Sequence, residues 1–129
     1  MNLLLDTHAL IWFVQGDSRL PFALRQHIEK EDIEAFVSVA SFWELAIKIS
    51  LKKFELHQEL RQLYNSLPTY NFKILPIAQD AIFLLSNLPF HHKDPFDRLL
   101  IATAIIEDLT LISADRQFQT YEGLSLLWE

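Results

Sequence analysis

Short apolar runs alternate along this chain with longer stretches that have helical periodicity. An apolar run of four to eight residues bounded by polar residues predicts a buried strand. A longer stretch that opens on a capping residue predicts a helix. Strands are predicted at residues 2–5, 35–39, 73–77 and 110–113, with a fifth at 125–128. Helices are predicted at residues 8–15, 21–31, 41–53, 58–67 and 79–88, and from residue 94 onward.

This alternation of strands and helices predicts an α/β fold on a central, mainly parallel sheet of four to five strands. The chain has 129 residues and contains no internal repeat, low-complexity tract or linker, so we expect one domain over residues 1–129. In open sheets of this kind, ligands bind beyond the carboxyl ends of the strands. Polar residues that follow the predicted strands are therefore the candidate site residues.

Acidic residues stand at those positions. Asp6 directly follows the first strand, and Asp115 follows the fourth. Glu44 lies near the start of the helix after the second strand, and Asp97 near the start of the helix before the fourth. Carboxylates that converge without matching bases repel one another, and either raised pKa values or a bound cation relieves the repulsion. Oxygen ligands favour Mg²⁺ or Mn²⁺, which can supply a water molecule for attack on a phosphorus atom.

Each acid also has a structural interpretation. Glu44 could complete a capping box with Ser41, because Ser-x-x-Glu is the usual pattern for that motif. Asp97 could serve only to stabilise the positive end of its helix. Asp115 could cap a short following helix, and we expect Asp94, which precedes Pro95, to be an N-cap. Asp6 favours function more clearly, because it sits between an apolar strand and an apolar helix.

Basic residues that could hold nucleic acid are few. Lys48, Lys52 and Lys53 fall at i, i+4 and i+5 of the predicted helix 41–53 and could contact a phosphate backbone, as could Arg116. A solvated helix face is the simpler interpretation of the three lysines.

Histidine and aromatic residues near the predicted sheet edge have mainly structural interpretations. We expect the pair His91–His92 on a loop surface and His8 on a helix surface. Trp12, Phe13 and Trp43 are expected to pack in the core.

Composition excludes several classes of protein. There is no cysteine, which excludes disulfides, cysteine-ligated zinc, iron–sulfur clusters and a thiol nucleophile. Only two glycines occur, so neither a dinucleotide-binding fingerprint nor a P-loop can be formed. The net charge of −6 disfavours a protein that coats phosphates over its whole surface. It leaves open a nucleic-acid enzyme that concentrates acids at a metal site.

Membrane and export signals are not expected. The longest strictly apolar run is Ala9–Val14, whereas a membrane-spanning helix needs about 18 apolar residues. No lysine or arginine precedes the first apolar run, and Asp6 interrupts it, which argues against a secretory signal peptide. Together with the lack of cysteine, these features predict a cytoplasmic protein without a membrane partner.

Four segments of the chain resemble the PIN-domain family, most closely the VapC-type toxin half of VapBC toxin–antitoxin modules. They occur in the family's order and span nearly the whole chain. These segments are residues 3–8 (LLLDTH), 41–48 (SFWELAIK), 92–102 (HKDPFDRLLIA) and 113–118 (SADRQF). The resemblance implies a three-layer α/β/α fold with a parallel sheet and an acidic pocket that holds Mg²⁺ or Mn²⁺.

The resemblance also implies roles for individual residues. By motif position, Asp6, Glu44 and Asp97 match the three core acids of the family, and Asp115 matches the fourth. Thr7 matches a small polar residue that helps the metal shell. The implied activity is that of a metal-dependent endoribonuclease that acts on RNA, forms a homodimer and is inhibited by a VapB-like antitoxin lying in a groove.

Three other functions remain open from the sequence. A structure-specific DNA nuclease would use the same acids on a different backbone. A phosphate-accepting signalling domain also clusters acids around Mg²⁺, but it needs adjacent acids after the first strand, where Asp6 is followed by Thr7. A PIN-like module without catalytic activity would bind an antitoxin and leave RNA intact.

Overall fold

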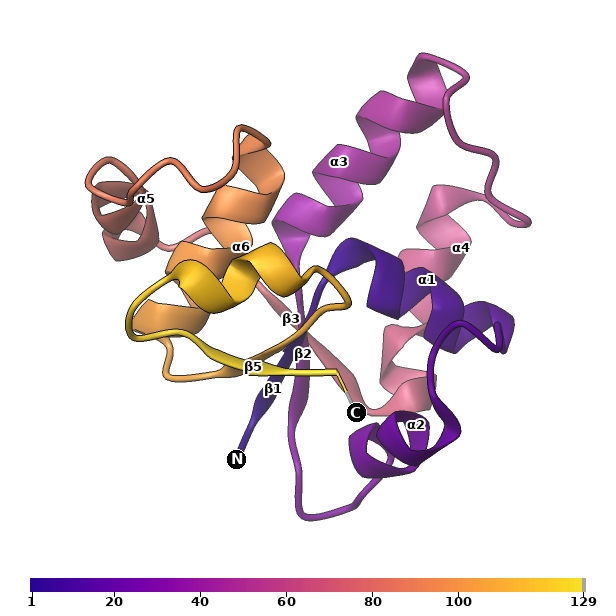
Figure 1. Ribbon diagram of the computed structural model, residues 1–129. Coiled ribbons are helices and arrows are strands. Elements are labelled where there is room, and N and C mark those ends of the chain that lie inside the picture. The colour runs from indigo at the N-terminus through magenta and orange to yellow at the C-terminus, as the bar shows by residue number, and fades with distance from the viewer. Residues whose placement is uncertain (129) are drawn as a thin grey trace.

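A five-stranded, fully parallel sheet forms the centre of the computed structural model, which describes residues 1–128 (Figure 1). The strand order is β3-β2-β1-β4-β5, so β1 lies at the middle of the sheet between β2 and β4. All five predicted strands are present. They are β1 (Leu3–Leu5), β2 (Ala35–Ser38), β3 (Phe72–Leu75), β4 (Thr110–Ile112) and β5 (Ser125–Leu127).

Helices cover both faces of the sheet, which confirms the predicted three-layer α/β/α architecture (Figure 1). The α-helices are α1 (Thr7–Gln15), α2 (Phe22–Ile28), α3 (Val39–Ser50), α4 (Leu60–Ser66), α5 (Gln79–Leu85) and α6 (Pro95–Ile106). Two short 3₁₀ helices follow α4 and β4, namely η1 (Leu67–Tyr70) and η2 (Arg116–Thr120). Helices α1, α2 and α4 pack on one face, and α5, α6 and η2 pack on the other.

Each face of the sheet has its own hydrophobic core. Side chains alternate between the faces of a strand, so neighbouring residues of β1 enter different cores. Leu3 and Leu5 pack with Phe13 of α1 in one core, whereas Leu4 packs with Ile101 of α6 in the other. All three leucines are fully buried. The middle strand is thus anchored on both sides, which fixes the position of the residue that follows it.

Helix α3 begins earlier than its sequence pattern predicts. The capping residue is Ser38, at the end of β2, whose hydroxyl accepts a hydrogen bond from the Ala40 amide at 3.0 Å. The predicted capping box between Ser41 and Glu44 is therefore wrong. Ser41 lies inside the helix and is buried, which leaves the Glu44 side chain free to reach the site.

The end of α3 also differs from the prediction and separates the three lysines. The helix ends at Ser50, and Lys52 adopts the left-handed conformation with a φ of 56°. The amides of Lys52 and Lys53 donate to the carbonyls of Ile49 and Lys48, at 3.0 and 2.9 Å, which is the arrangement of a Schellman motif. Only Lys48 belongs to the helix, so the three lysines do not share one helix face.

No helix within residues 1–128 combines the length and the apolar character needed to cross a membrane.

Candidate active site

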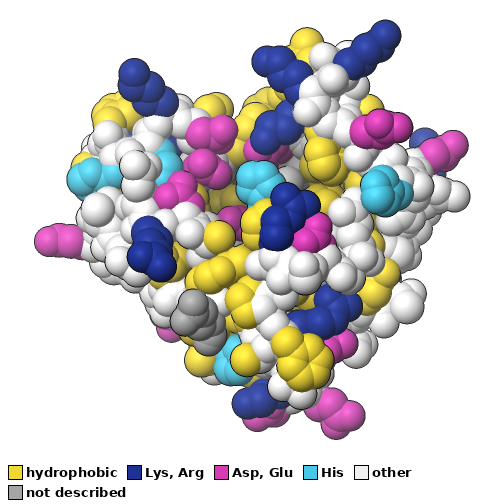
Figure 2. Space-filling model, turned by 45° about the vertical axis from the view of Figure 1, so that its right-hand side comes forward, with side chains coloured by type: hydrophobic (Ala, Val, Ile, Leu, Met, Phe, Trp, Pro, Cys, Tyr) yellow, Lys and Arg dark blue, Asp and Glu magenta, His cyan; other side chains and the backbone are white. Residues whose placement is uncertain are grey.

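An acidic cavity of about 350 Å³ lies at the carboxyl ends of the central strands. Among residues 1–128, five carboxyl groups and one lysine line it: Asp6, Glu44, Asp94, Asp97, Asp115 and Lys48. Figure 2 shows acidic side chains gathered in a hollow of this face. All four acids that the sequence singled out thus meet in one place, although they come from separate segments of the chain.

Asp6 is held at the junction between β1 and α1. Its amide donates to the Ile112 carbonyl of β4 at 3.1 Å, and its Oδ1 caps α1 by accepting from the Ala9 amide at 2.8 Å. The residue is only 8% exposed, and burial raises the pKa of its carboxyl group. The Ser113 side chain and the Ala9 amide lower that pKa by smaller amounts. A buried carboxylate with this little compensation is costly to ionise without a cation nearby.

Glu44 reaches the cavity from the second turn of α3 and is 5% exposed. Both of its oxygens are occupied: Oε1 accepts from the Thr7 hydroxyl at 2.6 Å, and Oε2 accepts from Lys48 Nζ at 2.7 Å. The Thr7 hydroxyl also lies 3.0 Å from the Ser41 hydroxyl. The hydrogen bond to Glu44 raises the pKa of Lys48. Lys48 therefore balances one of the acidic charges within the cavity.

Asp97 lies in the first turn of α6, where Asp94 and Pro95 start the helix as predicted. Oδ1 of Asp94 accepts from the amides of Phe96 and Asp97, at 2.8 and 3.0 Å, and confirms Asp94 as the N-cap. Burial is the main reason why the pKa of Asp97 rises to about 7, and the neighbouring carboxylates, first among them Asp94, raise it further. Asp94 thus has an electrostatic effect on the site in addition to its capping role.

Asp115 borders the cavity from the loop after β4. Its Oδ1 caps η2 by accepting from the Gln117 amide at 3.0 Å, and its Oδ2 lies 3.1 Å from His92 Nε2. The capping interpretation of Asp115 is therefore confirmed, and it coexists with a position at the acidic cavity.

His92 is the site residue that the sequence interpretation missed. We expected the pair His91–His92 on the loop surface, and this is wrong for His92, which is only 9% exposed. Its Nδ1 lies 3.2 Å from the Tyr121 hydroxyl, and a ring nitrogen lies within 4.8 Å of carboxylate oxygens of Asp97 and Asp115. The local sequence offers no signal for which of the two adjacent histidines faces inward, because the hydrogen-bond partners of His92, Asp115 and Tyr121, lie more than 20 residues further along the chain.

The predictions for the aromatic residues have mixed outcomes. Phe13 is buried in the core as predicted, and His8 is exposed and stacks on the half-buried Trp12 at 5.6 Å between ring centroids. Trp43 is 56% exposed, so its predicted core packing is wrong. It contacts the edge of the Phe96 ring at 5.1 Å instead, because its position on α3 points away from both cores.

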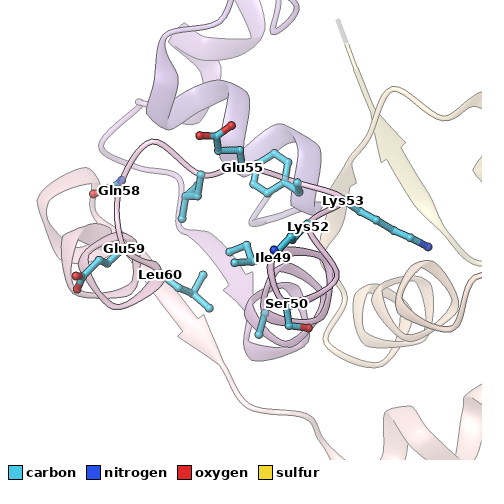
Figure 3. Close-up of a pocket in the computed structure, with 11 residues that line it drawn as sticks. Ile49, Ser50, Lys52, Lys53, Glu55, Gln58, Glu59 and Leu60 are labelled. Carbon is cyan, nitrogen blue, oxygen red and sulfur yellow. The ribbon is translucent and has the colours of Figure 1, made fainter.

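Lys52 and Lys53 line a separate groove of about 900 Å³ between the end of α3 and α4. Figure 3 shows this groove, with Ile49 and Leu60 lying among its lining residues and the Lys53 side chain extending away from them. In the described part of the chain, the groove and the acidic cavity share no lining residue. The exposed Arg116 borders a third, smaller cavity, which Asp115 also lines.

The donor set of the acidic cavity fits a hard divalent cation. Carboxylate oxygens predominate, and these are the ligands that Mg²⁺ and Mn²⁺ prefer. One lysine cannot neutralise five carboxyl groups. The pKa of Asp97 is raised mainly by burial, and its acidic neighbours raise it further. A bound cation would counter both effects by favouring the ionised form of each acid.

A comparison with known families identifies the class of protein that this fold and cavity define. The PIN domain family matches residues 3–124 of the chain. The chain therefore belongs to the PIN-domain family.

Individual relatives agree with this assignment. Ribonuclease VapC22 of Mycobacterium tuberculosis (strain ATCC 25618 / H37Rv) is 34% identical over 125 residues, which cover 93% of this chain and 92% of the relative. The solved structure of VapBC2 from Rickettsia felis, bound to a DNA fragment from its promoter, contains a chain with a TM-score of 0.73 and 17% identity, and both chains are covered completely. A toxin–antitoxin complex from Klebsiella pneumoniae gives a TM-score of 0.66 at 21% identity over 97% of this chain and 95% of the other. At these low identities, the two structural likenesses show the fold.

The raised pKa of Asp97 predicts that the metal-free protein loses stability as the pH rises. The folded state holds the Asp97 proton up to a pH of about 7, whereas the unfolded chain releases it near the model value of 3.8. The proton on Asp97 therefore stabilises the folded state at low pH. This contribution to the free energy of unfolding is lost as the pH rises from about 3.8 to about 7. Asp97→Asn removes the titrating group and should raise the melting temperature at pH 8 by several degrees, since each kcal/mol shifts a domain of this size by roughly 2–8 °C.

Thermal melts in a chelator at pH 5 and pH 8 would check this expectation. The melting temperature of Asp97→Asn should exceed that of the parent by more at pH 8 than at pH 5. Asp108→Asn is a matched control, because Asp108 is exposed in a left-handed turn that asparagine also tolerates. An advantage of equal size at both pH values would contradict the interpretation.

Proposed function

We propose that this chain is a Mg²⁺- or Mn²⁺-dependent endoribonuclease and the toxin of a toxin–antitoxin module. The observation that carries this proposal is the convergence of Asp6, Glu44, Asp97 and Asp115 on one cavity with a single lysine to offset them. The relative that is 34% identical over almost its full length is named a ribonuclease, which favours RNA as the substrate. Because RNA is abundant in the cytoplasm, the proposal includes a cytoplasmic site of action.

Each acid has a proposed role. Asp6 and Asp97 would bind the principal cation, and Glu44 and Asp115 would complete the shell directly or through water. Thr7 supports this set by donating to Glu44 at 2.6 Å, which directs the carboxylate toward the cavity. When bound, the cation supplies neutralisation of phosphate charge and a water molecule of lowered pKa.

The chain's own residues then orient the substrate and the attacking water. The buried acids Asp6 and Glu44 are held by hydrogen bonds from Ala9, Thr7 and Lys48, so their oxygens are positioned before substrate arrives.

Cationic side chains near the cavity are the proposed contacts for flanking phosphates. Lys48 lines the acidic cavity, and Arg116 lines the smaller third cavity, which shares Asp115 with it. Lys52 and Lys53 line the separate groove, so they would contact only RNA that extends well beyond the cleavage site. The local positive charge of lysine, arginine and the cation together would offset the net charge of −6 where RNA binds.

Asp6→Asn tests the proposed activity most directly. This substitution keeps the size of the side chain and its ability to accept from the Ala9 amide, but it removes a negative ligand. Cleavage of single-stranded RNA in Mg²⁺ should fall by more than about 100-fold, since loss of even an outer-shell partner costs roughly 10–100-fold. Asp108→Asn, outside the cavity, should cleave at the parental rate.

Three results would redirect this proposal. If Asp6→Asn cleaves RNA as fast as the parent, the metal mechanism is wrong. If the parent cleaves flap DNA and leaves RNA uncut, the chain is a DNA nuclease. RNA that stays intact after long incubation of the parent with Mn²⁺ would indicate a binding module without catalytic activity.

Direct binding of the cation should be visible as thermal stabilisation. A ligand that binds only the folded state adds about 2.7 kcal/mol of stability at a concentration 100 times its dissociation constant. We therefore expect millimolar Mn²⁺ to raise the melting temperature of the parent at pH 8 by several degrees, and to raise that of Asp97→Asn much less. Equal shifts in the two proteins would place the cation somewhere other than this cavity.

An antitoxin and a second copy of the chain are the proposed protein partners. The named complexes among the structural neighbours favour an antitoxin, and the groove beside α4, which contains Ile49, Phe54, Leu56 and Leu60, is the surface that we propose for its apolar side chains. If a small DNA-binding protein is encoded directly upstream, its co-expression with this chain should yield a complex without RNA-cleaving activity, and Leu60→Glu should weaken that complex. Sedimentation of the isolated chain should give twice the mass of one copy; a monomer would contradict the proposed homodimer.

A further inference from the structure

A chain of hydrogen bonds connects Tyr121, His92 and Asp115 at the border of the acidic cavity. We propose that His92, supported by Tyr121, is a positioning residue that fixes the Asp115 carboxylate in the orientation needed to bind the cation. This inference rests on the proposed function, because it assigns a task within the same metal site. It adds two residues to the acids that the sequence analysis singled out.

The chemistry of the two partners assigns one direction of donation to a neutral His92 ring. His92 Nε2 lies 3.1 Å from Asp115 Oδ2, and His92 Nδ1 lies 3.2 Å from the Tyr121 hydroxyl. An ionised carboxylate can only accept, so Nε2 must carry the proton. In a neutral imidazole, Nδ1 is then the acceptor and takes the proton of the Tyr121 hydroxyl. One tautomer of His92 therefore satisfies both contacts.

His92 is held firmly enough to act as a support. Its ring stacks on Tyr121, with centroids 5.6 Å apart and planes inclined by 20°, and meets Phe118 edge-on at 4.5 Å. Tyr121 and Phe118 are both buried. The buried Arg98 guanidinium donates to the carbonyl of Leu85, at the end of α5, and to those of Leu88 and Pro89 in the segment that leads to His92. The loop that carries His92 is thus tied to α6.

Asp115 needs this support more than the other acids do. Its side chain is 41% exposed, whereas the residues Asp6, directly after β1, and Glu44, within α3, are 8% and 5% exposed. An exposed carboxylate on a loop loses rotamer freedom when it binds an ion, and a prior hydrogen bond reduces that cost. The Gln117 amide holds Oδ1 and His92 holds Oδ2, while each oxygen retains a second lone pair for a cation or a water molecule.

Direct coordination of the cation by His92 is the competing role. A ring nitrogen of His92 lies within 4.8 Å of oxygens of Asp97 and Asp115, so the three groups are close enough together to hold one ion. Coordination through Nε2 would require that nitrogen to give up its proton, and the donation to Asp115 would be lost. A hard cation also prefers oxygen ligands to imidazole. The positioning role is consistent with both contacts that the structure contains.

The tautomer of His92 tests the proposal without reference to activity. Long-range ¹H–¹⁵N correlation spectra of the full chain, labelled at histidine and kept in a chelator at a pH where His92 is neutral, should show the Nε2–H form. Tyr121→Phe should reduce the population of that form, because it removes the donor to Nδ1 and leaves the stacked ring in place. A predominant Nδ1–H form in the parent would overturn the proposal.

Substitutions at His92 test the consequence for metal binding. His92→Phe keeps an aromatic ring but removes the donor, and it should raise the directly measured dissociation constant for Mn²⁺ by about 10–100-fold. His92→Gln places an amide donor near the position of Nε2 and should recover most of the affinity. His91→Gln is the matched control, since His91 is exposed and only packs edge-on against Tyr121, and it should bind Mn²⁺ as the parent does.

The outcomes separate this inference from the proposed function. Parental Mn²⁺ affinity in His92→Phe, or equally poor binding by the Phe and Gln variants, would overturn the positioning role. If His92→Phe does not fold in a thermal melt, Tyr121→Phe decides, with a several-fold weaker affinity expected and an unchanged affinity contradicting the proposal. If the parent binds Mn²⁺ but does not cleave RNA, the proposed function fails, and the tautomer and the affinities still decide the role of His92.

Discussion

Repulsion among carboxyl groups held in one small cavity is the constraint on which this site depends. Burial and the neighbouring charges raise the pKa of Asp97 to about 7, and Lys48 offers the cavity's only lysine in the described part of the chain. The acids stay together because the backbone that carries them is anchored elsewhere. The leucines of β1 enter both cores, so the residue after that strand, Asp6, cannot move away from the repulsion. Packing in the cores thus stabilises an arrangement that electrostatics alone would disperse.

The acids are not equivalent in the way they are held. Asp6, at the end of β1, and Glu44, within α3, are both buried and have hydrogen-bond donors from the local backbone or from neighbouring side chains. Asp115 lies on a more exposed loop, and its orientation depends on the Gln117 amide and on His92. The acidic cavity therefore has a rigid inner side, set by the sheet, and an outer side whose order depends on side-chain hydrogen bonds. The buried His92 lies on this outer side, within hydrogen-bond distance of Asp115.

Local patterns predicted much of this protein, and their failures have physical causes. The five strands and the Asp94 N-cap follow from apolar runs and from Asp-Pro at a helix start, and both are present. The capping box at Ser41 was wrong because Ser38 ends β2 and caps α3 first, which is a competition that propensity alone does not resolve. The common lysine face failed because α3 ends at Ser50 in a Schellman motif with Lys52, and not glycine, in the left-handed conformation. The first and last residues of a helix thus depend on which nearby groups make the hydrogen bonds at its ends.

The sequence by itself determined the alternation of elements, the positions of the acids at strand ends and the family resemblance, because each of these depends on residues that are close together in the chain. Tertiary structure alone decided which side chains share the cavity and in what state. The burial behind the raised pKa of Asp97, the hydrogen bond from Thr7 to Glu44, and the inward orientation of His92 all require that distant segments be packed together. Electrostatic and hydrogen-bond energies depend on distance in space, which local sequence patterns do not encode.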